Sequence, residues 1–82
     1  MMTLTVHLFA RARELAGGPT VALDLPAGAT VAVLRRALAG RFPPLAPLLE
    51  RSAVAVNHDF ADDSRALAPA DEVAVIPPVS GG

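Results

Sequence analysis

The stretch that decides the fold is residues 71–82, which read DEVAVIPPVSGG. Its apolar part, VAVI at 73–76, is rich in β-branched residues and is typical of a buried β-strand. Pro77-Pro78 then removes two backbone N–H donors, so the strand must end before this pair. Gly81-Gly82 follows, and glycine has no Cβ to hinder the approach of another molecule. We therefore expect a final strand that leads into a short tail of nearly bare backbone.

A tail of this kind points to its own terminal carboxylate as the reactive group. No side chain crowds a carboxylate on Gly82, and Gly81-Gly82 can pass through a narrow channel of another enzyme. The alternative is that a Gly-Gly end is frayed chain or a cloning remnant, because termini are commonly disordered. What precedes the pair has to decide between these interpretations.

The rest of the sequence predicts a small mixed domain. Period-two alternation predicts strands, and helix-forming runs with apolar residues three and four apart predict helices. Turn residues are expected at 57–59 and 62–64, and Leu67 is expected to pack beneath the domain. We expect strands at 4–9, 21–25, 53–56 and 72–76, a very short strand at Phe60, and helices at 10–16, 31–39 and about 45–51.

The main helix has recognisable end signals. Thr30 is a suitable N-cap, because its hydroxyl can accept a hydrogen bond from a free backbone N–H. Val31, Leu34 and Leu38 share one helical face. Gly40 is the expected residue just beyond the C-terminus, so we predict that this helix ends at about residue 39.

This order of elements predicts an α+β fold of the β-grasp, or ubiquitin-like, kind: a mixed sheet with one main helix packed on one face. In that arrangement the first two strands pair, and the last strand lies in the centre of the sheet, parallel to the first. The central pairing is an inference from the fold, because the sequence pattern does not give strand order. We expect residues 1–77 to form the domain and residues 78–82 to form a flexible Gly-Gly tail.

The sheet face opposite the helix is expected to be unusually apolar. Alternation places Leu4, Val6 and Leu8 toward the core and His7 and Phe9 on the other side. The open face would then carry, besides these two, Ala55, Ala74 and Ile76, with Phe60 able to join them. Such a patch on a small domain often has a partner, although single apolar residues are also common on any surface.

Composition excludes several classes of function. The 82 residues carry a net charge of −1 and contain no cysteine, so a disulfide framework, a thiolate nucleophile and a Cys-based metal site are excluded. The seven basic residues, all arginine, are scattered, which argues against a nucleic-acid surface. We expect no signal peptide, no membrane span and a cytoplasmic location.

The polar residues do not form a recognisable catalytic set or metal site. His7 and His58 are expected on the surface, and Asp62-Asp63 is expected in a solvated turn. Gly17-Gly18 is interpreted as a turn, since the strand-to-helix context of a dinucleotide fingerprint is missing. Any reaction would therefore take place largely in a partner.

Taken together, these segments resemble the small-subunit family of molybdopterin synthase. The resemblance covers essentially the whole chain, and its most specific part is the ending Pro-Pro-Val-Ser-Gly-Gly after an Asp-Glu-Val strand. One departure is Pro69-Ala70, where the family usually has a glycine before Asp71. The segments that carry the resemblance are FA at 9–10, RELAG at 13–17, LPAGATV at 25–31, VAVN at 54–57 and the whole of 71–82.

The resemblance implies a ubiquitin-like sulfur carrier. A ubiquitin-activating-like adenylyltransferase, using ATP, would adenylate Gly82, which would then become a thiocarboxylate with sulfur from a donor enzyme. The tail, Pro78, Val79, Ser80, Gly81 and Gly82, would enter the catalytic pocket of the large synthase subunit. There the sulfur would pass to cyclic pyranopterin monophosphate.

The resemblance also implies how the subunits associate. Phe9, Phe60 and Ile76 occupy the matching positions of the family's contact with its partners, and the synthase would be a heterotetramer. This chain would bind no metal and no cofactor of its own, and would contact neither nucleic acid nor membrane.

Two alternatives remain open at this point. One is a sister sulfur carrier, for thiamine or tRNA thiolation or for protein conjugation, since these also end in Gly-Gly. The other is a non-catalytic β-grasp adaptor with an incidental Gly-Gly end. Deletion of Gly82 separates carrier from adaptor, because an adaptor would keep its binding and function.

Overall fold

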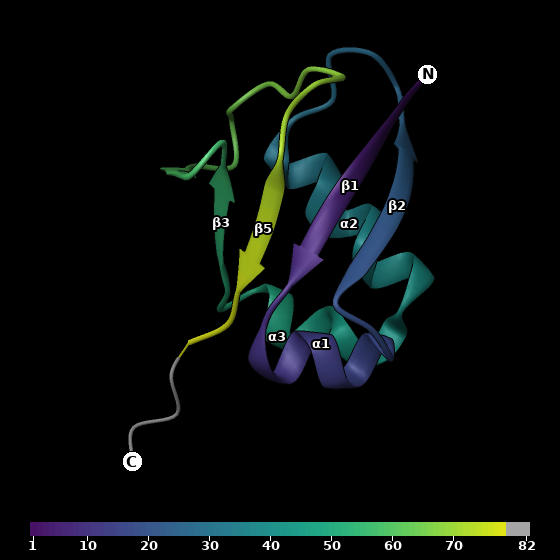
Figure 1. Ribbon diagram of the computed structural model, residues 1–82, viewed down its shortest axis with the longest axis vertical. Coiled ribbons are helices and arrows are strands. Elements are labelled where there is room, and N and C mark those ends of the chain that lie inside the picture. The colour runs from purple at the N-terminus through teal and green to yellow at the C-terminus, as the bar shows by residue number, and fades with distance from the viewer. Residues whose placement is uncertain (79–82) are drawn as a thin grey trace.

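The computed structural model describes residues 1–78 of the chain. Within these residues the helices and strands follow the order expected from the sequence (Figure 1). They are β1 (Met2–Leu8), α1 (Ala10–Ala16), β2 (Thr20–Leu25), α2 (Val31–Arg41), the 3₁₀ turn η1 (Pro43–Leu45), α3 (Ala46–Leu49), β3 (Ala53–Val56), β4 (Asp59–Ala61) and β5 (Val73–Ile76).

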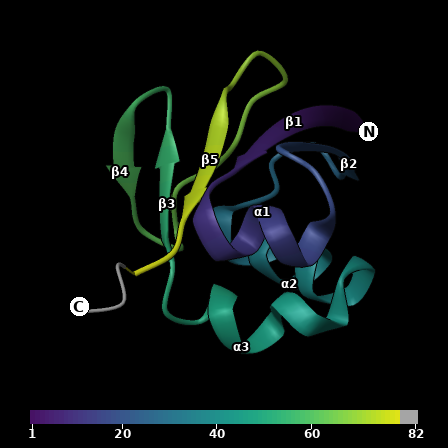
Figure 2. The ribbon, with the colours of Figure 1, turned by 60° about the horizontal axis from the view of Figure 1, so that its bottom comes forward.

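The strands form one mixed sheet in the order β2-β1-β5-β3-β4. The last strand, β5, lies in the centre and runs parallel to β1, with Val6 beside Val73 and Leu8 beside Val75. The other pairings are antiparallel. The helices lie on one side of the sheet and leave the other side open (Figure 2). The predicted α+β, β-grasp arrangement with a central, parallel last strand is confirmed.

The core lies between α2 and the sheet. The predicted stripe of Val31, Leu34 and Leu38 is fully buried, and the Thr30 hydroxyl accepts a hydrogen bond from the Val33 N–H at 3.4 Å, as expected of an N-cap. Leu67 is buried as predicted. The side chains that the sheet contributes to this core are Met2, Leu4, Val6, Leu8, Val21, Leu23, Leu25, Val54, Val56, Val73 and Val75.

The prediction that α2 ends at about residue 39, with Gly40 just beyond it, is wrong. The helix continues through Gly40 to Arg41, and Phe42 leaves the helical conformation with φ −126° and ψ 79°. The physical reason is the next residue: the ring of Pro43 clashes with a helical conformation of the residue before it. Pro43 therefore stops this helix at Arg41, two residues beyond the predicted end.

The connection from β1 to β2 is longer than the tight turn of a simple hairpin, because α1 lies within it. Gly17 ends α1 in the left-handed region, with φ 80°, and its N–H bonds the carbonyls of Arg13 and Glu14. This is the common way for a helix to end at glycine.

The domain boundary predicted at residue 77 stays a prediction, although Pro77 is buried and Pro78 is exposed. Val79, Ser80, Gly81 and Gly82 lie outside the described residues. None of the helices in residues 1–78 has the length and apolar character needed to cross a membrane.

Candidate functional site

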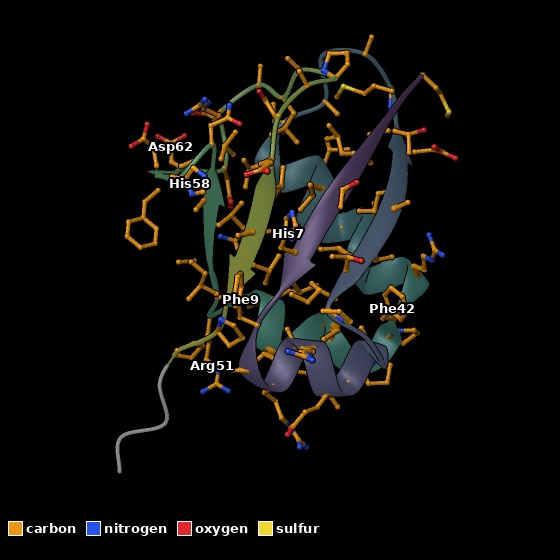
Figure 3. The ribbon with its side chains drawn as sticks, viewed as in Figure 1. His7, Phe9, Phe42, Arg51, His58 and Asp62 are labelled. Atoms are coloured by element: carbon orange, nitrogen blue, oxygen red, sulfur yellow. The ribbon has the colours of Figure 1, made fainter. Side chains whose placement is uncertain are left out.

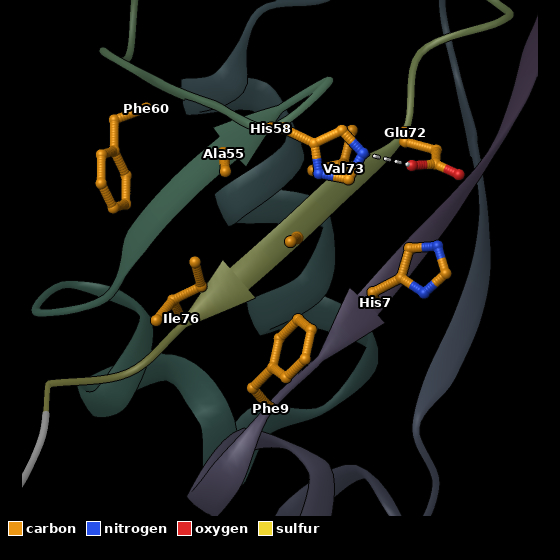
Figure 4. Close-up of a pocket in the computed structure, with 9 residues that line it drawn as sticks. His7, Phe9, Ala55, His58, Phe60, Glu72, Val73 and Ile76 are labelled. Carbon is orange, nitrogen blue, oxygen red and sulfur yellow. Dashed lines mark ion pairs between the residues drawn. The ribbon is translucent and has the colours of Figure 1, made fainter.

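The open face of the sheet carries a hollow of about 360 Å³ (Figure 4). Phe9, Phe60 and Ile76 lie around it with 50%, 76% and 37% of their surface exposed. The strand-parity prediction that these three side chains share the open face is confirmed; their role in binding a partner stays a prediction. The complete lining is His7, Phe9, Ala55, His58, Phe60, Glu72, Val73, Ala74 and Ile76.

The sheet register explains why the surface is hollow here. One row crosses four strands: His7 on β1 pairs with Ala74 on β5, Ala74 with Ala55 on β3, and Ala55 with Phe60 on β4. Two alanines thus lie between two larger side chains. A partner that fills the hollow would release water from a mostly apolar surface.

Phe9 and Ile76 close the end of the hollow from which the tail leaves. Phe9 follows β1 directly and keeps an extended backbone, with φ −119° and ψ 155°, so the alternation of β1 continues through it. Ala10 then turns the chain into α1 with φ 50°. Ile76 is the last residue of β5, opposite Ala53. The root of the tail therefore lies at the rim of the hollow.

The opposite rim is built by a tight turn. Asn57 and His58 join β3 to β4 with φ values of 52° and 71°, the two left-handed residues of a type I′ hairpin turn. Asparagine is common at the first position and glycine at the second. A histidine there costs about 1–2 kcal/mol relative to an unstrained residue. Its imidazole Nε2 lies 3.4 Å from Glu72 Oε2 (Figure 4).

Asn57 ties this turn to the start of β5. Its N–H donates to the Glu72 carbonyl at 2.8 Å, and its side-chain oxygen accepts from the Glu72 N–H at 2.9 Å. Its side-chain amide also donates to Asp71 Oδ1 at 2.9 Å. The backbone of Glu72 is thus fixed on both sides by one residue.

Asp71 closes the turn that precedes β5. It accepts from the Ala68 N–H at 2.8 Å and from the Asn57 amide, and these bonds, with the backbone one first, hold the pKa of Asp71 below its ordinary value of 3.8. Pro69-Ala70, where the family usually has a glycine before Asp71, thus lies in a turn that the Asp71 side chain closes.

The Asp62-Asp63 pair lies in an exposed turn, as predicted. The Ser64 hydroxyl and then the Ser64 N–H donate to Asp62 and lower the pKa of its carboxyl. Asp63 accepts from Arg35 Nε at 2.8 Å. Both carboxylates therefore have structural partners.

Sequence reasoning missed the part played by Arg35. Its guanidinium also donates to the carbonyls of Leu49 and, at 2.8 Å, Ser52. It thereby joins α2 to the entrance of β3 and to the loop before β5. The available signal was an arginine at the edge of the buried stripe of α2, but its three acceptors are far away in sequence.

Several expected features can now be placed. His7 lies on β1 and is half-buried, while the His58 side chain is exposed in its turn (Figure 3). Among residues 1–78, no group of histidine and carboxylate side chains could hold a metal ion. Of the tail residues singled out from the sequence, Pro78 is described and exposed. Val79, Ser80, Gly81 and Gly82 lie beyond the part that the structure describes.

Comparisons with known proteins agree with this fold. Residues 6–82 match the model of the ThiS family. The chain is 40% identical over 79 residues to a molybdopterin synthase sulfur carrier subunit of Arabidopsis thaliana, covering 96% of this chain and 82% of that protein.

Two solved structures are also similar. The crystal structure of small archaeal modifier protein 1 from Haloferax volcanii superposes with a TM-score of 0.89 at 32% identity, covering 96% of this chain and all of that one. A second match, at 23% identity and a TM-score of 0.70, covers 99% of this chain and 100% of the other. It comes from a complex of subunits 1 and 2 of the molybdopterin-converting factor of Helicobacter pylori, and at that identity it shows the shared fold alone. The chain belongs to the ThiS family and, within it, to the sulfur-carrier small subunits of molybdopterin synthase.

Proposed function

We propose that the α-carboxylate of Gly82 carries sulfur and donates it to cyclic pyranopterin monophosphate in the active site of a large synthase subunit. The observation that carries the proposal is the position of β5. This strand lies in the centre of the sheet and ends at Ile76, on the rim of an exposed apolar hollow. A protein that docks over the hollow therefore receives the root of the tail at its own surface.

The chemistry requires activation by another enzyme. A carboxylate is a poor electrophile, so the adenylyltransferase joins it to the AMP part of ATP and releases pyrophosphate. Hydrosulfide, delivered by a sulfur donor, then attacks the acyl carbon, and AMP leaves. The product is a thiocarboxylate, whose sulfur is a good nucleophile at neutral pH. Covalent carriage divides one difficult transfer into easier steps.

The product sets the stoichiometry. Molybdopterin contains a dithiolene, a group with two sulfur atoms, so the formation of each molybdopterin consumes two thiocarboxylates. In each transfer the thiocarboxylate sulfur bonds to a carbon of the precursor, and a carbon–oxygen bond of that carbon breaks. Water then hydrolyses the bond between the acyl carbon and the transferred sulfur, which regenerates the Gly82 carboxylate. The need for two carriers is consistent with a heterotetramer of two small and two large subunits.

Docking is assigned to Phe9, Phe60 and Ile76. These side chains are exposed in the free chain although they are strongly apolar, and covering them is favourable. The 40% identity to a molybdopterin synthase sulfur carrier subunit of Arabidopsis thaliana supports a large-subunit partner here. The ATP in this scheme is bound by the activating enzyme.

The tail has the length and shape that delivery requires. Five residues, 78–82, can span at most about 17 Å when extended. Gly81-Gly82 brings no side chain, so a slot that fits bare backbone would admit it and reject bulkier sequences.

Reconstitution tests the proposal. The chain is incubated with its activating enzyme, ATP and sulfide, and then with its cognate large subunit and cyclic pyranopterin monophosphate, and molybdopterin is measured. Deletion of Gly82 should abolish product. Deletion of Met1, which is 93% exposed at the other end of the chain, is the matched control and should leave it unchanged. Normal product formation without Gly82 would contradict the proposal.

The similarity to the small archaeal modifier protein favours one second candidate, attachment of the activated carboxylate to lysines of other proteins. The chain contains no lysine, so any lysine adduct must include a second protein. Incubation of the adenylated chain with a lysine-containing acceptor protein, followed by peptide mass spectrometry, detects such an isopeptide bond. The sister carriers for thiamine or tRNA thiolation are tested by their failure to form molybdopterin in the reconstitution.

A further inference from the structure

The hollow on the open face is lined by apolar side chains except at one rim. Among the described residues, its lining includes three groups that can carry charge: His7, His58 and Glu72. The Glu72 carboxylate and the His58 ring lie side by side at this rim, and His7 lies on the neighbouring strand β1 (Figure 4). A partner that covers the hollow must therefore meet one carboxylate and two imidazoles.

The position of Glu72 is held by the backbone around it. Two hydrogen bonds between Asn57 and the backbone of Glu72, one donated by each residue, fix the peptide groups on either side of Glu72. The Glu72 side chain is 62% exposed. The fixed backbone therefore keeps the Glu72 side chain at the rim, beside the apolar floor of the hollow.

His58 occupies a place where glycine is the favoured residue. Its φ of 71° is strained for a side chain, and the turn would form more readily with glycine. The ring is 88% exposed, so it adds little to the core. Strain at an exposed residue is a reason to look for a function of its side chain. That side chain lies against the Glu72 carboxylate.

We propose that Glu72 binds an arginine or lysine side chain of the partner protein that covers the hollow, and that His58, when protonated, competes for the same carboxylate. This inference rests on the proposed docking function. It adds the chemistry of the partner surface: an apolar centre with a cation opposite the rim formed by β5 and the β3–β4 turn.

The charge distribution favours a cation over an anion at this rim. Glu72 is the one carboxylate among the side chains that line the hollow, and no arginine or lysine is among them. An anionic partner group would be repelled here.

The shape of the site favours a long side chain. Arginine and lysine have apolar stems that pack along surfaces such as those of Phe9, Ala74 and Ile76 while the charged head remains at a polar group. Such a side chain would contact the apolar floor of the hollow with its stem and the Glu72 carboxylate with its charged head. A short cationic group would reach Glu72 without covering the apolar floor.

The arrangement makes docking sensitive to pH. Imidazoles change charge between about pH 5 and pH 8. Protonated His58 gives Glu72 a cation within the same chain and repels the partner's cation, so docking weakens as pH falls. His7 also lines the hollow, on the neighbouring strand β1.

Binding to the cognate large subunit, measured by calorimetry, tests the inference. Glu72→Gln keeps the shape of the side chain and should weaken docking about tenfold at pH 8. Asp24→Asn removes the same charge on β2 and retains an acceptor for the Thr3 hydroxyl, so it should stay within about twofold of the original chain. Glu72→Gln affinity equal to that of Asp24→Asn would overturn the inference.

His58→Gly provides a second test that does not threaten the fold, because glycine relieves the strained turn. Between about pH 8 and pH 5.5, its affinity should fall several-fold less than that of the original chain. Parallel pH profiles for the two chains would overturn the competition by His58. If the original chain does not bind the large subunit under any condition, the proposed function itself fails, whereas normal binding with unchanged variants overturns the inference alone.

Discussion

Replacing Phe60 with alanine tests whether the open face is an interface. The ring is 76% exposed in the free chain. A phenylalanine can bury about 200 Å², so a partner that covers the exposed part would bury about 150 Å². At about 25 cal/mol per Å² this is worth about 4 kcal/mol, and ordering the side chain costs about 1 kcal/mol. The upper estimate for the docking loss is therefore about 3 kcal/mol, or roughly 150-fold.

The measurement is a calorimetric titration of the cognate large subunit with Phe60→Ala, paired with a urea unfolding curve of the free variant. Stability should change by less than about 0.5 kcal/mol, because the ring lies outside the core. Phe42→Ala is the matched control: Phe42 packs beside the core, with the Arg41 guanidinium 5.6 Å from its ring centre. That variant should lose stability and keep docking. Unchanged docking of Phe60→Ala would refute the assignment of this face.

Three further predictions concern Gly17, Asp71 and Gly81. Gly17→Ala should lower the free energy of unfolding by about 1 kcal/mol, because Gly17 has a left-handed φ of 80°. Gly18→Ala should lower it less, because Gly18 has no left-handed φ. Urea unfolding of both variants checks this. Hydrogen bonds lower the pKa of Asp71 in the folded chain, so its contribution to stability is present above pH 3.8 and is lost as pH falls through the pKa of the folded state. Asp71→Asn should therefore make the free energy of unfolding less dependent on pH in the acid range. An unchanged acid dependence would contradict this. Gly81→Val should slow molybdopterin formation more than Gly81→Ala does, and both should keep docking through the open face; full activity of Gly81→Val would show that the channel is roomy.

The strands and the open face could be predicted because their signals are local. Alternation along β1 placed Leu4, Val6 and Leu8 in the core and Phe9 outside, and the structure confirms each side. Strand order is a different matter, since the pairing of β1 with β5 joins residues more than sixty positions apart. It was correct because the order of elements matched a known fold, and no pattern within either strand encodes it.

The errors and omissions arise where two signals compete or where partners are distant. Gly40 carried a stop signal for α2, but Pro43 acts on Phe42 and determines the actual end. Arg35 bonds three groups brought near it by folding. The His58–Glu72 pair depends on the β3–β4 turn meeting the start of β5. The contacts of Arg35 and of the His58–Glu72 pair exist only after the fold has formed, whereas the effect of Pro43 on Phe42 is local.

The central claim is that the α-carboxylate of Gly82 is the group that carries sulfur, and intact mass spectrometry tests it most directly. The chain is incubated with its activating enzyme, ATP and sulfide, and then digested to locate any change. The account predicts that one oxygen is replaced by one sulfur, in the C-terminal peptide and in no other peptide. A chain that gains no sulfur, or that gains it at an internal residue, would contradict the account.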